Sequence, residues 1–222
     1  MRNPAWCVTT ALLLTGCVSP SERAELPPAA WIVRLKPSKV IAGQPFSLAP
    51  SGLSTLIVIG LYLPAQCRVR IGNQSLEANV SPAGTEATAL VPEAVFAKPG
   101  AFEVTVEQPD GRRSNPLPFT VLSETGPEPA IAALYPAGTI AGQPFNVQPQ
   151  RGAAVRIRGA DFLPGAKVLF GSTELDTVFV AEDDLSAWVP PALFAQPGVI
   201  QVTVRNPDGK RSTPKPFQVM AR

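Results

Sequence analysis

The sequence predicts an all-β protein made of two tandem β-sandwiches. The chain has 26 Pro and 17 Gly among 222 residues, yet hydrophobic residues make up 45%. Frequent proline disfavours long helices, and the hydrophobic content disfavours disorder. A stretch of sixteen residues also occurs twice, as Val104–Phe119 (VTVEQPDGRRSNPLPF) and Val202–Phe217 (VTVRNPDGKRSTPKPF), with eleven identical positions. This repeat indicates a duplicated domain.

The duplication extends well beyond this hairpin. Ile41–Phe46 and Ile140–Phe145 both read IAGQPF, at an offset of 99 against 98 at the hairpin. A period of this length suits a complete globular domain rather than a solenoid unit. The predicted plan is a signal peptide over 1–16, a lipidated cysteine and flexible tether over 17–30, a first domain over 31–122, a linker over 123–129 and a second domain over 130–222. The linker is short and polar, so some motion between the domains is expected.

Short apolar runs bounded by Gly or Pro predict the strands. Strand signals every 8–12 residues, with turn residues between them, are typical of antiparallel sheets packed as a sandwich. Single helical turns are expected at Glu93–Ala97 and Pro191–Ala195. In the second copy the predicted strands are Ile131–Tyr135, Phe145–Gln148, Ala154–Arg158, Lys167–Phe170, Thr177–Val180, Leu185–Val189, Val199–Arg205 and Pro216–Met220.

The repeated hairpin has turn chemistry that explains its shape. Pro207 presets its own φ angle, Asp208 suits the next position, and Gly209 can adopt the positive φ of a type I turn followed by a bulge. Pro214 and Pro216 lack N–H groups, so the following strand is expected to lie at a sheet edge or to begin after them.

The order of these signals resembles the IPT/TIG family of immunoglobulin-like domains, of the E-set type. The first copy departs from the family pattern at Gly60-Leu-Tyr-Leu63, where Gly-x-Asn/Asp-Phe is usual. The resemblance implies a fold and no reaction, so no catalytic residue follows from it. In the second copy it is carried by Gly142, Ile157–Phe162, Val168–Gly171, Trp188–Pro190, Gly198–Val202 and Asn206–Gly209.

The N-terminus predicts export and lipid attachment. Arg2 precedes a short apolar segment, Cys7–Leu14, which is too short to span a membrane. The segment ends in Leu14, Thr15, Gly16 and Cys17, which resembles the lipobox of bacterial lipoproteins. The resemblance implies a diacylglyceryl group on the Cys17 thiol, cleavage before Cys17 and acylation (palmitate) of the new amino terminus. The alternative is an ordinary secretory signal in which Cys17 is incidental.

The residues after Cys17 indicate where the protein would reside. Val18 replaces the Asp that favours retention at the inner membrane, so the outer membrane of the cell envelope is predicted. Ser19–Ala30 reads as an extended tether of at most roughly 40 Å.

Composition excludes several classes of function. The formal charge is +2, which does not suit a nucleic-acid partner. The chain has no His, which removes the Ser-His-Asp triad and every His-containing zinc site. Of the three cysteines, only Cys67 lies in the predicted domains, and we interpret it as a partly buried free thiol. We expect no enzyme activity, no catalytic residues, no cofactor and no bound metal.

Three groups of residues are candidates for binding, each with a simpler alternative. Glu182–Asp184 could hold Ca²⁺, but a solvated turn fits its spacing better. Cations beside the hairpin tips could meet phosphate groups of lipid or lipopolysaccharide, or be solvated strand ends. Trp188 could be a glycan platform, but core or interdomain packing is favoured. The cations are Arg112, Arg113, Lys210 and Arg211.

The function hypothesis is therefore a non-enzymatic envelope lipoprotein. Its two immunoglobulin-like modules would serve protein–protein interaction or structural spacing, with the lipid anchor as the membrane contact. The alternative is a glycan-binding accessory protein of polysaccharide handling at the cell surface.

Overall fold

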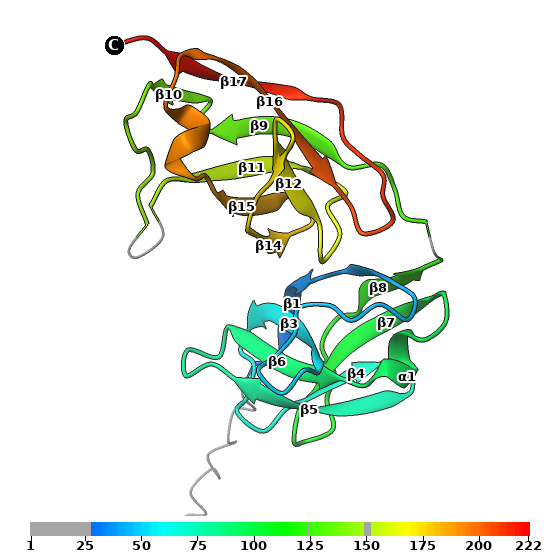
Figure 1. The fold of residues 1–222 in the computed structure, drawn as a ribbon. Helices are drawn as coiled ribbons and strands as arrows, with labels where there is room; N and C mark the ends of the chain where they lie inside the picture. Colours follow the sequence, from blue (N-terminus) through cyan, green and yellow to red (C-terminus); the bar gives the residue numbers. More distant parts are fainter. Residues whose placement is uncertain (1–27, 124, 149–151) are drawn as a thin grey trace, which may run out of the picture.

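The computed structural model describes residues 28–123, 125–148 and 152–222, and it consists of two β-sandwiches stacked along the chain (Figure 1). The signal peptide, Cys17 and most of the predicted tether lie outside the described residues. Each sandwich has its own hydrophobic core cluster. The predicted all-β, immunoglobulin-like fold is confirmed.

Within residues 28–123 the strands form one eight-stranded sheet, in the order β1-β3-β6-β5-β4-β7-β8-β2, which folds into two layers. Strand β5 pairs with both β6 and β4, so it connects the layers. The elements are β1 (Trp31–Lys36), β2 (Lys39–Ile41), β3 (Ser54–Leu61), β4 (Arg68–Ile71), β5 (Gln74–Val80), β6 (Glu86–Val91), α1 (Glu93–Phe96), β7 (Gly100–Glu107) and β8 (Leu117–Leu122).

Within residues 125–148 and 152–222 the strands form two separate sheets, β10-β17-β16-β12-β13 and β14-β15-β11-β9. The counterpart of β5 is divided here into β13 and β14, and between them the N–H of the buried Leu175 donates to the carbonyl of Val168. The elements are β9 (Ala130–Tyr135), β10 (Gly138–Ile140), β11 (Ala154–Ala160), β12 (Lys167–Phe170), β13 (Thr173–Glu174), β14 (Thr177–Ala181), β15 (Asp184–Trp188), the 3₁₀ turn η1 (Pro191–Phe194), β16 (Gly198–Arg205) and β17 (Lys215–Met220).

Phenylalanine rings fill both cores at matched positions. In the second sandwich Phe170, Phe217, Phe145 and Phe194 form a chain with ring centroids 5.0–5.2 Å apart. The first sandwich has the three-ring chain Phe119, Phe46 and Phe96. The counterpart of Phe170 is Ile71, a smaller side chain that leaves a fourth ring out.

Most of the predicted elements are present. Seven of the eight strands predicted in the second copy are confirmed to within two residues at each end, as are both helical turns. Phe145–Gln148 was wrongly predicted as a strand. Asn146 has φ 42° at a bend, which is incompatible with an extended strand, and Gln148 forms only an isolated bridge with Gly152. The positive φ predicted for Gly209 is confirmed at 86°.

The prediction of an edge strand after the hairpin prolines is wrong. Strand β17 contains Pro216 yet lies between β16 and β10. Strand β10 pairs in parallel with Gln218–Met220 only, so the position that lacks an N–H is beyond its reach. Strand β2 pairs with β8 in the same parallel way in the first sandwich.

Candidate functional site

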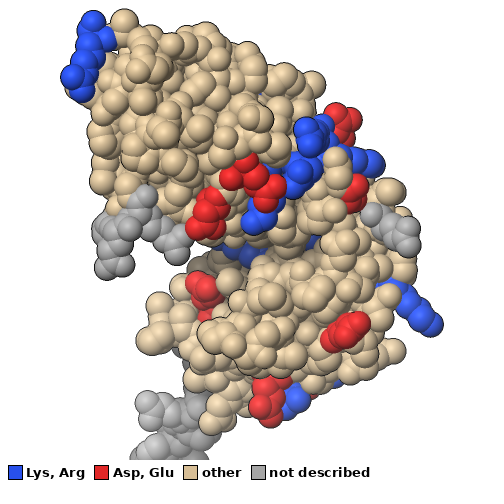
Figure 2. Space-filling model, viewed as in Figure 1, with Lys and Arg blue, Asp and Glu red and all other residues tan. Residues whose placement is uncertain are grey.

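The two sandwiches meet through polar contacts to the acidic turn at Glu182–Asp184. The Nη2 atom of Arg34 on β1 lies 2.6 Å from Oδ1 of Asp183. The backbone N–H of Ser38 donates to a side-chain oxygen of Glu182. Figure 2 shows basic and acidic side chains gathered along the boundary between the sandwiches. This turn therefore joins the two halves of the molecule.

The interpretation of this turn as solvated is wrong for Asp184, whereas Glu182 and Asp183 are partly exposed. Asp184 is buried and accepts two hydrogen bonds from Arg156, at 2.8 Å and 2.5 Å. Arg158 lies 3.6 Å from both Asp183 and Asp184. The hydrogen bond from Arg34 holds the pKa of Asp183 below its ordinary value, with a smaller contribution from the charge of Arg158. Three guanidinium groups thus neutralise the acidic turn that could have suggested Ca²⁺.

A second ion pair crosses the boundary close to the linker. The Nζ atom of Lys39 lies 3.0 Å from Oδ1 of Asp161, whose φ is 57°. The carbonyl of Asp161 accepts a hydrogen bond of 2.9 Å from the side chain of Asn206, which is 1% exposed. The turn of the repeated hairpin is therefore attached to a loop that contacts the first sandwich.

The same hairpin holds the linker. The N–H of Gly126 donates to Oδ2 of Asp208 at 2.8 Å, and the carbonyl of Gly126 accepts from Nζ of Lys210. Asn206 also donates to the carbonyl of Pro127. Gly126 is buried, and a Cβ atom there would lie 2.6 Å from Leu163. Both backbone groups of this glycine are bound, which restrains the segment between the sandwiches.

The four hairpin cations have different surroundings. Lys210 binds the linker. Arg112 lies 2.7 Å from Asp110, and Arg113 lies 3.5 Å from Glu107. Arg211 is exposed beside its turn. A phosphate-binding role for these residues stays a prediction.

The aromatic candidates are distributed differently from the prediction. Trp188 is half-buried in β15. The more exposed rings are Trp31 at 57%, Tyr62 at 63% and Tyr135 at 56%. The sequence analysis did not single out Tyr135. A comparison of the two copies could have done so, because Tyr135 stands where the first copy has Lys36.

An open pocket of about 530 Å³ lies beside Tyr135 on the outer face of the sheet β14-β15-β11-β9. It is lined by Tyr135, Pro136, Asn146, Arg156 and Arg158. Tyr135 and Arg156 are cross-strand partners on β9 and β11, so their side chains lie on the same face.

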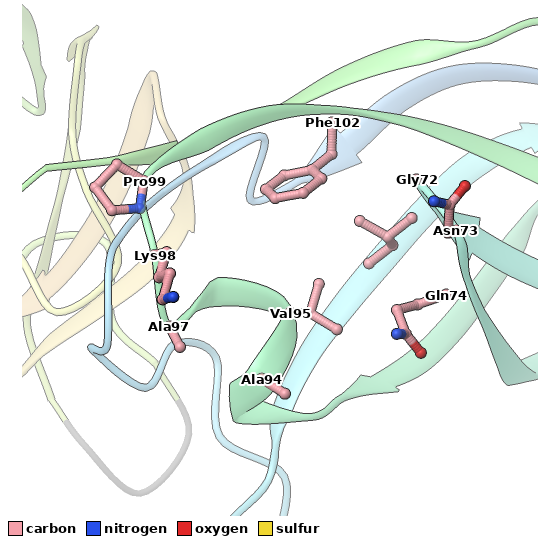
Figure 3. A pocket seen from close by; sticks show the side chains of 10 residues that line it. Gly72, Asn73, Gln74, Ala94, Val95, Ala97, Lys98, Pro99 and Phe102 are labelled. Atoms are coloured by element: carbon pink, nitrogen blue, oxygen red, sulfur yellow. The ribbon is translucent and has the colours of Figure 1, made fainter.

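The first sandwich has a cleft of about 630 Å³ at the end that carries α1 (Figure 3). Ile71, Val95, Pro99 and Phe102 make its apolar wall, and Lys98 lies at its rim. The counterparts of Ile71 and Val95 in the second sandwich are the larger Phe170 and Leu193, both packed in the core. The cleft therefore lies at one of the places where the two copies differ.

Within the described residues, no group of three or more His, Cys, Asp or Glu side chains is placed to hold a metal ion. No helix in the same part of the chain is long and apolar enough to cross a membrane. Cys67 is a buried free cysteine, and burial raises the pKa of its thiol.

The comparison with known families decides the identity of the second half. Residues 140–219 match the IPT/TIG domain. The second sandwich is an IPT/TIG domain. The resemblance predicted from its turns and strands is thus confirmed, and the first sandwich repeats its motifs and its core. No curated protein matches the sequence.

Several solved structures resemble the chain at low identity. SGBP-B from a xyloglucan utilization locus in Bacteroides uniformis is 17% identical, with 86% of this chain and 50% of that chain covered and a TM-score of 0.45. SGBP-B from a mixed-linkage glucan utilization locus of Bacteroides ovatus, in complex with a heptasaccharide, is 11% identical, with 83% and 44% covered and a TM-score of 0.42. The chain spans half or less of the length of these two proteins.

Proposed function

We propose that the protein is a non-enzymatic lipoprotein of the bacterial envelope. Cys17 carries the lipid, and the two sandwiches form a spacer that presents a binding surface to an envelope partner. The observation that carries this proposal is the junction, where Arg34, Ser38 and Lys39 contact the second sandwich and Gly126 is bound through both backbone groups.

Interfaces of this kind between domains are commonly mobile. A spacer needs a defined angle between its parts, and a bound linker supplies one because it removes the freedom of the connecting segment. The ion pairs of the junction are partly exposed, so they contribute little to stability and serve mainly to fix the orientation of the two sandwiches. The arrangement suits a protein that holds its second sandwich at a set position beyond the tether.

The anchor is tested by membrane fractionation of a Cys17→Ala variant. We expect the wild type in the outer-membrane fraction and the variant in the soluble envelope fraction, because the lipid is the attachment. Cys67→Ala is the matched control, since its thiol is buried, and it should fractionate as wild type. A Cys17→Ala protein that stays with the membrane would refute the lipid anchor.

The partner is tested by crosslinking in intact cells. A photo-crosslinker at exposed positions of the second sandwich should capture an envelope component, and the same label on the first sandwich should capture less. Equal or absent capture across growth conditions would contradict the presenting role. Glycan binding is the second candidate function, favoured by the exposed Tyr135 beside fixed arginine side chains.

A further inference from the structure

The pocket beside Tyr135 has a covered counterpart in the first sandwich. Tyr135, Asn146 and Arg156 occupy the positions of Lys36, Ser47 and Ile57, at a constant offset of 99. In the first sandwich those three residues line a cavity of about 370 Å³ whose opposite wall belongs to the second sandwich. That wall is made by Pro164, Gly165, Phe179 and Val180. The chain thus uses this face once for docking and leaves it open once.

A second copy of the chain does not fit the open face. Docking in the first sandwich depends on Arg34 and Lys39, but the second sandwich has Ala133 and Gly138 at these positions. If the first sandwich of a second molecule docked on this face, it would present Thr85 at the position that Asp183 occupies in the internal junction, so the acidic partner would also be missing. The polar contacts that hold the internal junction would all be absent.

The chemistry of the open face points to a different ligand. The Tyr135 side chain is 56% exposed next to the Pro136 ring, so it offers a flat apolar surface. The guanidinium of Arg156 is fixed by two hydrogen bonds to Asp184, yet its side chain is 49% exposed. Asn146 adds an exposed amide with both donor and acceptor atoms. A flat ring beside pre-oriented polar groups favours a ligand with one apolar face and a polar edge.

We infer that this pocket is a sugar-binding site for a glycan of the cell surface or its surroundings. The C–H face of a pyranose ring would stack on Tyr135, and its hydroxyl groups would pair with Arg156 and Asn146. The lining holds two positive charges, Arg156 and Arg158. Asp183 and Asp184 lie next to the pocket and offset these charges through ion pairs, so a neutral sugar fits the pocket better than an acidic one. This inference rests on the binding role proposed above and names its ligand class.

The test is a polysaccharide array probed with the full chain carrying Cys17→Ala for solubility. The array holds neutral glycans (β-glucans, xylans, mannans) and acidic ones (polygalacturonate, alginate). We expect binding to a neutral glycan, a loss of at least about tenfold in affinity for Tyr135→Ala, and retention within about twofold for Tyr135→Phe, which keeps the ring.

Trp31→Ala is the matched control, because it removes an equally exposed ring outside the pocket and should leave binding unchanged. Hydrogen exchange of each variant checks that the second sandwich stays folded. Absence of binding to every glycan would overturn the inference, as would equal binding by Tyr135→Ala or a preference for the acidic glycans. These outcomes are independent of membrane fractionation, so a failed anchor and a failed sugar site can be told apart.

Discussion

The two sandwiches share a core and a hairpin but differ at every polar position of their junction. The polar residues of the first sandwich that contact the second are replaced by Ala or Gly in the second copy. The acidic residues of the second sandwich that bind them are replaced by non-acidic residues in the first copy. The pairs, contact residue first, are Arg34/Ala133, Ser38/Ala137, Lys39/Gly138, Asp161/Tyr62, Glu182/Gly84 and Asp183/Thr85. Duplication supplied the scaffold, and substitutions on the two meeting surfaces made the contact specific.

The hairpin tips show how one residue changes the role of an identical motif. In the second sandwich Asp208 and Lys210 bind the N–H and the carbonyl of Gly126. In the first, Asp110 pairs with Arg112. The sequence position that corresponds to Gly126 is Pro27, and proline has no N–H to donate. The same tip therefore binds a linker in one copy and itself in the other.

The largest expected difference between the copies concerns the residue before each turn. Asn206→Ala should lower the free energy of unfolding of the second sandwich by about 3 kcal/mol, because a buried side chain loses bonds to Leu163, Asp161 and Pro127. The matched Gln108→Ala should cost the first sandwich about 1 kcal/mol, since among the described residues the side chain of Gln108 receives one hydrogen bond, of 3.2 Å from the N–H of Ala30. Native-state hydrogen exchange reads each sandwich separately, and equal losses would contradict the different roles of the tips.

Exchanging the residues at the matched core position, Ile71 and Phe170, should change the stability of the two sandwiches by different amounts. Phe170→Ile should destabilise the second sandwich by about 2 kcal/mol, because it leaves a void beside Phe217. Ile71→Phe should change the first sandwich by less than about 1 kcal/mol, because the open cleft of Figure 3 can take the added atoms. The measurement is urea unfolding with hydrogen exchange. A loss of similar size in both variants would show that the cleft does not accommodate a ring.

The junction should change in geometry more than in stability. Arg34→Ala should cost under about 1 kcal/mol, because Arg34 and Asp183 are both partly exposed, but it should broaden the distribution of distances between the sandwiches. Spin labels on the two sandwiches would measure these distances. Arg68→Ala is the control, since Arg68 lies 3.9 Å from Glu77 within the first sandwich. An unchanged distribution for Arg34→Ala would remove this ion pair from the docking contacts.

Lowering the pH should have the smallest effect on the distances between the sandwiches. The pKa of Asp183 is lowered in the docked state, so its contribution is complete above the ordinary value of 3.8 and is lost as the pH falls through the lowered value. We therefore expect the same distances from pH 8 to 5 and a broader distribution only once the pH falls below 3.8. Asp183→Asn should show the broad distribution at every pH. A transition near pH 6 would implicate a different group.

Sequence patterns predicted the features that depend on local chemistry. Alternating strands such as Val202–Arg205 and the turn at Gly209 are set by neighbouring residues, and both are present. The acidic turn was misread because Asp183 and Asp184 find their cations at distant positions, Arg34 among them. Likewise, nothing in the sequence around Phe145 indicates that this apolar residue packs in the core from a loop and not from a strand. Comparison of the copies, position by position, would have marked both Glu182–Asp184 and Tyr135.

The parallel pairing of β2 with β8 affects how the first sandwich resists a pulling force. Lys39–Ile41 and Thr120–Leu122 run side by side in the same direction, one near the entry of the chain and the other at its exit. A pull between the tether and the second sandwich, once it reaches β2, draws these strands past each other. Their hydrogen bonds are then loaded together instead of opening one by one from an end. The sandwich nearer the predicted anchor is thus built to carry tension in shear.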